Sequence, residues 1–150
     1  MWLVLRRNFR ARVKRGRYMI VCVCGMIGAG KTTWCKEQAG VVSDFDDIGD
    51  KRIQLQFTLK KHEAGEKVYH ITCFPTREER EAFDKETYVK YVWINTSFVQ
   101  CRKNIFSRNR SRDIENIESV LNANENIMEK YFYSDLKFEV VDVFESEEKW

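Results

Sequence analysis

The sequence predicts an α/β three-layer sandwich built on a five-stranded parallel sheet. Five short apolar runs alternate with longer segments in which apolar residues recur at helical spacing. Strands that alternate with helices pair in parallel, because a parallel pair needs a crossover connection. The chain has 150 residues, of which 43% are hydrophobic and one is proline, so it suits a single core without long disordered linkers. The predicted strands are residues 18–24, 41–43, 68–73, 91–94 and 138–144.

The first predicted strand, 18–24, runs directly into a glycine-rich segment. Residues 31–38 then have a helical pattern, and Gly40 stands where a C-cap glycine would end that helix. The short apolar run 41–43 is the second predicted strand, and an acidic cluster follows it directly.

The segment from residue 48 to residue 64 has two interpretations. Alternating apolar residues are typical of a strand: Ile53, Leu55, Phe57 and Leu59. Helical spacing also places four residues on one face: Ile48, Leu55, Leu59 and His62. A parallel sheet needs a crossover at this point, and Gly65 stands where a helix would end, so we predict a helix.

The second half of the chain repeats the alternation of strand and helix. Thr76 and Glu79 match the capping-box pattern, which predicts a helix over 76–85. We expect two further helices, at 97–108 and 114–131, separated by a basic break. In parallel sheets ligands bind beyond the carboxyl ends of the strands, so we expect functional residues at that edge.

The most specific motif is G-x-x-x-x-G-K-T at residues 25–32, directly after the first predicted strand. Its glycines let backbone N–H groups converge on a phosphate, and the following helix directs the positive end of its dipole there. In this motif the lysine, here Lys31, reaches the β- and γ-phosphates, and the Thr32 hydroxyl helps to hold Mg²⁺. We therefore predict that the chain binds ATP with Mg²⁺. The residues expected to contact the nucleotide are Gly25, Gly28, Ala29, Gly30, Lys31, Thr32 and Thr33.

The acidic cluster after the second strand suits the acceptor side of a phosphoryl transfer. A carboxylate within hydrogen-bond reach of an acceptor hydroxyl can remove its proton, and we assign this role to Asp46. Asp44 is expected to help Thr32 to hold the metal. Neighbouring carboxylates repel one another, so we expect a raised pKa in this cluster, which would suit a base. The alternative is a set of ordinary strand-end and N-cap aspartates.

The basic break between the last two helices is interpreted as a lid. Its positive charge comes from Arg102, Arg108, Arg110 and Arg112. Arginine binds phosphate through two parallel hydrogen bonds, so such a segment can close over a triphosphate. We expect Arg108 or Arg112 to stabilise charge on the transferred phosphoryl group and Arg110 to bind the nucleotide. The alternative is a solvated basic turn that pairs with Asp113 and Glu115.

Charge, cysteine content and hydropathy limit the partners. The net charge of +3 does not indicate a general nucleic-acid coat, although residues 1–17 hold seven Arg or Lys and no acid. We interpret residues 1–18 as a basic N-terminal extension, which is dispensable, a transit-like leader or an arm that contacts phosphate backbones. The five cysteines lack metal-binding spacing, which favours reduced thiols and a cytoplasmic location. No run approaches the ~20 apolar residues of a membrane span, so no membrane partner is expected.

Three segments together match a known pattern: residues 25–34 (G-M-I-G-A-G-K-T-T-W), residues 41–47 (V-V-S-D-F-D-D) and the R-x-R-x-R run at 108–112. In them the chain resembles the small phage-type P-loop kinases of the polynucleotide-kinase and nucleotide-kinase group, over roughly residues 19–144. The resemblance implies a P-loop kinase-like domain over 19–150, an acceptor-activating role for Asp46 and a transition-state role for one lid arginine. It also implies the host cytoplasm as the location of a phage-encoded protein.

The chain departs from that group in lacking a carboxylate on the third strand, so Mg²⁺ would depend on Thr32, phosphate oxygens, water and Asp44. The sequence thus predicts an ATP- and Mg²⁺-dependent phosphotransferase that acts on a nucleotide or a nucleic-acid 5′-hydroxyl. A monophosphate acceptor would need basic residues such as Arg77 and Arg80. The alternatives are a P-loop ATPase and a nucleotide-binding module without an acceptor.

Overall fold

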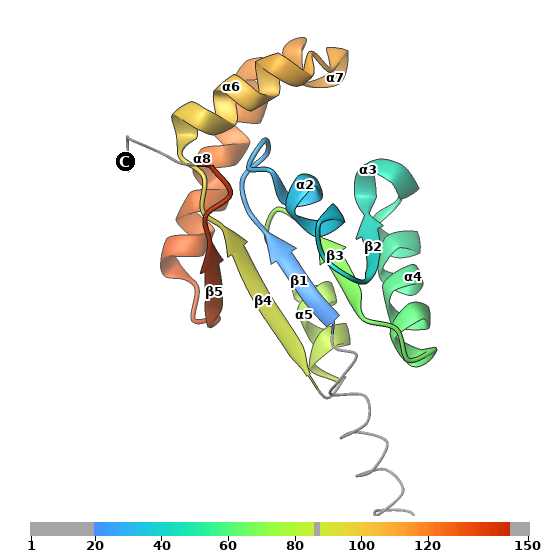
Figure 1. Ribbon diagram of the computed structural model, residues 1–150. Helices are drawn as coiled ribbons and strands as arrows, with labels where there is room; N and C mark the ends of the chain where they lie inside the picture. Colours follow the sequence, from blue (N-terminus) through green and yellow to red (C-terminus); the bar gives the residue numbers. More distant parts are fainter. Residues whose placement is uncertain (1–19, 86–87, 145–150) are drawn as a thin grey trace, which may run out of the picture.

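The computed structural model describes residues 20–85 and 88–144, and a five-stranded sheet forms its centre (Figure 1). The strands are β1 (Ile20–Cys24), β2 (Val41–Asp44), β3 (Val68–Ile71), β4 (Val89–Ile94) and β5 (Phe138–Val141). They lie in the order β2-β3-β1-β4-β5, and every neighbouring pair is parallel. The predicted α/β sandwich with a five-stranded parallel sheet is confirmed. The predicted extension, 1–18, lies outside the described residues.

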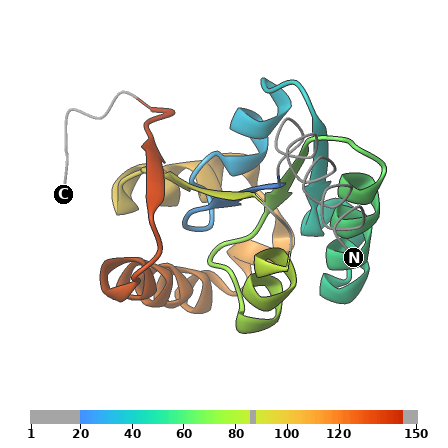
Figure 2. The same cartoon turned by 90° about the horizontal axis from the view of Figure 1, so that it is seen from below.

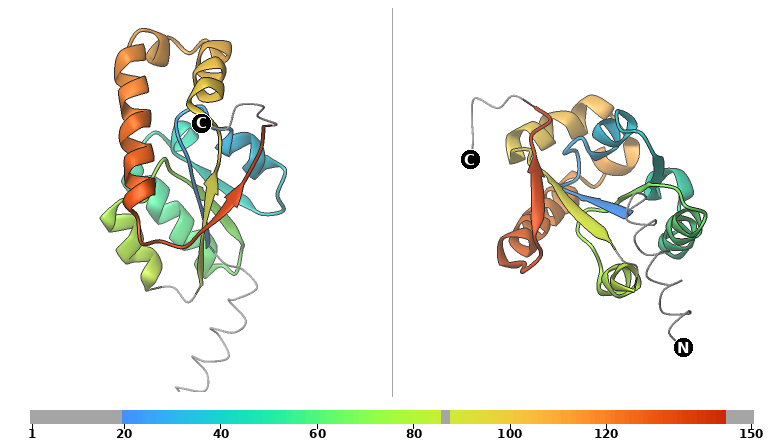
Figure 3. Two further views of the ribbon diagram at one scale, coloured as in Figure 1. Left: turned by 90° about the vertical axis from the view of Figure 1, so that its left-hand side faces the viewer. Right: turned by 60° about the horizontal axis from the view of Figure 1, so that its bottom comes forward.

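Helices cover both faces of the sheet, as Figure 2 shows. One face is covered by α4 (Lys51–Glu63), α5 (Arg77–Asp84) and α8 (Ile117–Tyr133), and α2 (Lys31–Lys36) lies on the other. The short α3 (Phe45–Ile48) follows β2 directly. Beyond the carboxyl edge, α6 (Phe98–Arg108) and α7 (Ser111–Ile114) form an arch with the start of α8 (Figure 3). No helix in the described part of the chain is long and apolar enough to cross a membrane.

The core is centred on β1, whose five residues are all buried. Because parallel sheets are covered on both faces, a central strand has apolar side chains on both sides. On the face covered by α8, the Trp93 ring stacks on Tyr131 with centroids 4.0 Å apart, and Phe138 packs edge-on against Trp93. Such aromatic contacts add to the free energy of simple area burial and join the last helix to the sheet.

The crossover between β2 and β3 is the predicted helix, α4. It ends as predicted at Gly65, whose φ is +86° and whose N–H donates to the carbonyl of His62, an arrangement typical of a Schellman motif. The predicted face is confirmed in part: His62 is buried, and Leu55 and Leu59 pack half-buried against the core. Ile48 instead belongs to α3, and the other fully buried residues of α4, Gln54 and Thr58, are polar. The reason is hydrogen bonding, because Gln54 Nε2 donates to two strand-end carbonyls, of Ser43 at 3.1 Å and Ile71 at 2.8 Å.

Several predicted boundaries shift. The strand predicted over 91–94 begins earlier, at Val89, and the helix predicted over 114–131 begins at Ile117, since α7 occupies part of the basic break. The strand predicted over 138–144 ends at Val141. Phe144 instead packs over the phosphate-loop motif, where a Cβ built on Gly30 would lie 3.0 Å from its ring. The capping box of Thr76 and Glu79 is confirmed at the start of α5.

Candidate active site

The G-x-x-x-x-G-K-T segment forms a tight loop between β1 and α2, as predicted. Gly28 and Gly30 have φ of +83° and +96°, a region that L side chains rarely adopt. Gly28 has a second constraint, because a Cβ there would lie 2.6 Å from the carbonyl oxygen of Cys101 on α6. The first N–H groups of α2 have no carbonyl partner within the helix, and Gly30 at its N-cap has no side chain to accept from them. These N–H groups are therefore available to an anionic ligand, and the ring of Phe144 borders the same end of the loop at Gly30.

Side chains from distant elements fix the loop from outside. Thr96 Oγ1 donates to the Ala29 carbonyl at 2.7 Å, and Asn104 Nδ2 donates to the Gly28 carbonyl at 2.8 Å. Asn124 on α8 is 1% exposed and pairs with Ile27 twice: Ile27 N donates to its Oδ1 at 2.7 Å, and its Nδ2 donates to the Ile27 carbonyl at 3.0 Å. Sequence reasoning assigned no role to these three side chains, because nothing distinguishes them from polar surface residues before the fold is known.

Lys31 lies within the loop that it follows. Its Nζ donates to the carbonyls of Gly25 at 2.7 Å and Met26 at 2.9 Å, and it lies 3.5 Å from Cys73 Sγ. The ammonium group thus sits between the ends of β1 and β3, at the edge of the sheet where a ligand of the loop would lie.

Thr32 and Asp44 lie together, as the predicted metal site requires. Thr32 Oγ1 donates to Asp44 Oδ2 at 2.9 Å, and Asp44 is 5% exposed. The other oxygen, Oδ1, accepts from Asp46 N at 3.1 Å and caps α3, so the alternative N-cap role of Asp44 is also present. Among the described residues no group of three or more His, Cys, Asp or Glu side chains could hold a metal. A hydroxyl and one carboxylate still suit Mg²⁺, which takes oxygen ligands and obtains the rest from phosphates and water.

Asp46 pairs with two arginines of the predicted lid. Its Oδ2 accepts from Arg110 Nη1 at 3.0 Å and its Oδ1 accepts from Arg112 Nη1 at 3.3 Å. Burial raises the pKa of Asp46, but the hydrogen bonds and charges of Arg110 and Arg112 outweigh burial and bring the pKa below its ordinary value. The raised pKa expected for a base is therefore wrong for Asp46, because two guanidinium groups, rather than its neighbouring carboxylates, dominate its surroundings.

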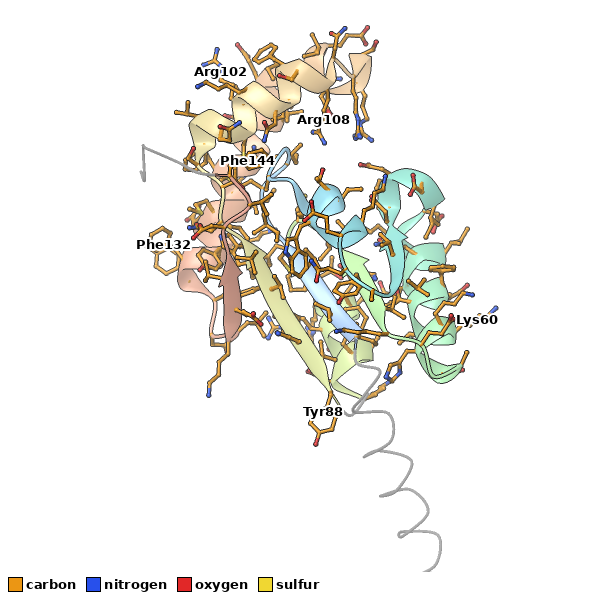
Figure 4. All side chains as sticks on the ribbon, viewed as in Figure 1. Lys60, Tyr88, Arg102, Arg108, Phe132 and Phe144 are labelled. Carbon is orange, nitrogen blue, oxygen red and sulfur yellow. The ribbon has the colours of Figure 1, made fainter. Side chains whose placement is uncertain are left out.

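The other two arginines of the predicted lid, Arg108 and Arg102, point in different directions. Arg108 Nη2 lies 3.6 Å from Asp113, a 4% exposed carboxylate that also pairs with Arg112, so part of the predicted acidic pairing is present. Figure 4 shows Arg108 on the side of α6 that faces the phosphate loop, whereas Arg102 points away from it. Arg102 instead lies over the Phe106 ring, 5.8 Å from its centroid, so the structure does not bring it to the site.

A buried polar chain lies beside the end of β3, where the third-strand carboxylate is missing. Lys51 Nζ donates to Thr72 Oγ1 at 3.1 Å, and Thr72 lies 3.5 Å from Glu79. Glu79 pairs with His70, and His70 Nδ1 bonds to Thr58 Oγ1 at 2.7 Å. Burial raises the pKa of Glu79, but the opposing effects of His70 and Lys51 are larger, so the pKa lies below its ordinary value. Both His70 and Glu79 are buried, which agrees with a structural role for this pair.

Comparison with protein-family models found no match, and comparison with curated proteins found none either. The functional proposals therefore depend on the geometry of the described residues.

Proposed function

We propose that this protein is a Mg²⁺-dependent phosphotransferase that moves the γ-phosphate of ATP to a nucleotide or to the 5′-hydroxyl of a nucleic acid. One observation supports the proposal above the others: the fold brings Asp46 and two arginines of the predicted lid together within hydrogen-bond distance. Asp46 is 64 positions from Arg110 and 66 positions from Arg112 in the chain.

On the donor side, the loop would receive the phosphates and Lys31 would contact the β- and γ-phosphates. Thr32 and Asp44 would hold Mg²⁺, which neutralises phosphate charge when it is bound. Lys31 and Arg108 or Arg112 would stabilise the charge of the transferred group and Arg110 would bind the nucleotide, because hydrogen bonds between ions are stronger than neutral ones.

On the acceptor side, Asp46 would orient the acceptor hydroxyl and accept its proton late in the transfer. While Arg110 and Arg112 pair with it, Asp46 has a low pKa and is a weak base, so in that state it would position the acceptor rather than remove its proton. Arg77 pairs with Glu81 and Arg80 lies 4.0 Å from Asp135, and both pairs are exposed enough for a monophosphate acceptor to displace them. We place the reaction in the cytoplasm because all five cysteines are free thiols.

The test is a transfer assay with γ-labelled ATP and Mg²⁺ against deoxynucleoside monophosphates, nucleosides and 5′-hydroxyl oligonucleotides. Wild type should label at least one acceptor, and Asp46→Ala should reduce the rate by about 10²-fold or more. Asp47→Ala is the matched control, since Asp47 is the next residue of α3, is exposed, and makes no ion pair with any described residue. Equal losses in the two variants would contradict the role of Asp46. Phosphate release without any labelled acceptor would contradict the transferase function.

A further inference from the structure

We propose that Asp46 is the counter-ion of the lid in the nucleotide-free site, and that a bound triphosphate takes Arg110 and Arg112 from it and so frees its carboxylate for the acceptor. This inference rests on the proposed function, because it concerns the order in which that site binds its donor and its acceptor. ATP binding would then leave the Asp46 carboxylate free to bind the acceptor hydroxyl.

Each carboxylate oxygen of Asp46 accepts a hydrogen bond from one arginine. Oδ2 accepts from Arg110 at 3.0 Å, and Oδ1 accepts from Arg112 at 3.3 Å. The backbone of Asp46 is fixed as well, because its N–H donates to Asp44 at the start of α3. Each oxygen can accept a second hydrogen bond, but the guanidinium groups withdraw its charge and lie against it, so an acceptor hydroxyl competes with an arginine for Asp46 as long as the lid stays there.

The cations expected on the triphosphate are all held by protein oxygens. Lys31 donates to two carbonyls of its own loop, and Arg112 bridges Asp46 and the buried Asp113. A triphosphate has more negative charge and more acceptor oxygens than one carboxylate, so it is the stronger partner for two guanidinium groups. Asp113 would keep the base of the lid in place during the exchange, since it is buried and also lies near Arg108.

The exchange needs little energy because the pairs are partly exposed to water. The side chain of Asp46 is 37% exposed, and those of Arg110 and Arg112 are 43% and 59% exposed. Ion pairs at such positions contribute little to stability. They are strong enough to hold the lid near Asp46 and weak enough to be displaced by a multivalent anion.

The test is calorimetric titration of the full chain with the β,γ-imido analogue of ATP and Mg²⁺. Asp46→Asn removes the competing charge, so it should tighten the Kd roughly three- to tenfold. Asp47→Asn removes the same charge from the next residue of α3, which makes no ion pair with a described residue, and should change the Kd less than about twofold. Asp46→Ser repeats the test with a different side chain.

A double-mutant cycle separates pairing from general electrostatics. With both arginines replaced, as Arg110→Gln/Arg112→Gln, the further change Asp46→Asn should no longer tighten binding. The inference is overturned if Asp46→Asn leaves the Kd unchanged or weakens it, if Asp47→Asn tightens it equally, or if the effect persists without the arginines. Wild type that does not bind the analogue would overturn the proposed function itself, and the inference with it. Binding that is normal but insensitive to Asp46 would overturn the inference alone.

Discussion

Asn124 gives the sharpest prediction about the phosphate loop. The substitution Asn124→Ala removes both hydrogen bonds to Ile27, of 2.7 Å and 3.0 Å, from a side chain that is 1% exposed. Each such bond contributes about 1 kcal/mol, and leaving the partly buried N–H and carbonyl of Ile27 unpaired adds to the cost. Alanine recovers about 0.5 kcal/mol through its higher helix propensity. The expected net loss in the free energy of unfolding is about 2–3 kcal/mol.

The matched control is Asn122→Ala on the same helix, since Asn122 is exposed. Both variants gain the same helix propensity, so their difference isolates the contacts with Ile27. Urea unfolding gives the two free energies, and titration with the β,γ-imido analogue of ATP gives the affinities. Asn124→Ala should be the less stable variant and should bind the analogue more weakly, because the loop has lost an anchor. Unfolding free energies of the two variants that agree within about 0.5 kcal/mol would refute the claim that Asn124 fixes the loop.

Three further predictions concern the loop, the buried ion pair and the lysine. In thermal unfolding, Gly28→Ala should lower the unfolding free energy by at least about 1 kcal/mol more than Gly49→Ala. Both glycines have positive φ, but only at Gly28 would the added Cβ lie 2.6 Å from a backbone carbonyl oxygen, so equal losses would contradict the packing. Glu79 has a folded-state pKa below its ordinary 4.5, so its contribution to the unfolding free energy is complete above pH 4.5 and is lost as the pH falls through the folded pKa. Urea unfolding should therefore show a weaker loss of stability at acidic pH for Glu79→Gln than for wild type, and equal losses would contradict this. Lys31→Met should weaken binding of the ATP analogue at least about tenfold in calorimetry while the far-ultraviolet circular dichroism stays unchanged, and unaltered affinity would contradict the assignment of the phosphate loop.

The sequence was most informative where the determining contacts are local. The glycine turn between β1 and α2, the Schellman end of α4 and the capping box of α5 each depend on residues a few positions apart, so short patterns predict them. The parallel sheet also followed from local information, because alternation of strand and helix leaves few other topologies.

Contacts between distant segments could not be predicted in this way. The buried row of α4 is polar because Gln54 reaches carbonyls of β2 and β3, and a helical pattern of apolar residues does not include such a role. The pKa of Asp46 was misjudged for the same reason. Its neighbours in the chain are carboxylates, but its neighbours in space are Arg110 and Arg112. The sequence identified Asp46, Arg110 and Arg112 as site residues, but it did not predict that they pair.

The central claim is that the phosphate loop and Asp46 serve one transfer reaction. The most direct measurement follows the γ-phosphate of labelled ATP in a single reaction of the wild-type chain with Mg²⁺ and a mixture of 5′-hydroxyl oligonucleotide and deoxynucleoside monophosphates. We predict that the label appears in one acceptor, and that inorganic phosphate stays at the level of an enzyme-free control. Label that accumulates only in inorganic phosphate, at the same rate with and without acceptor, would contradict the claim.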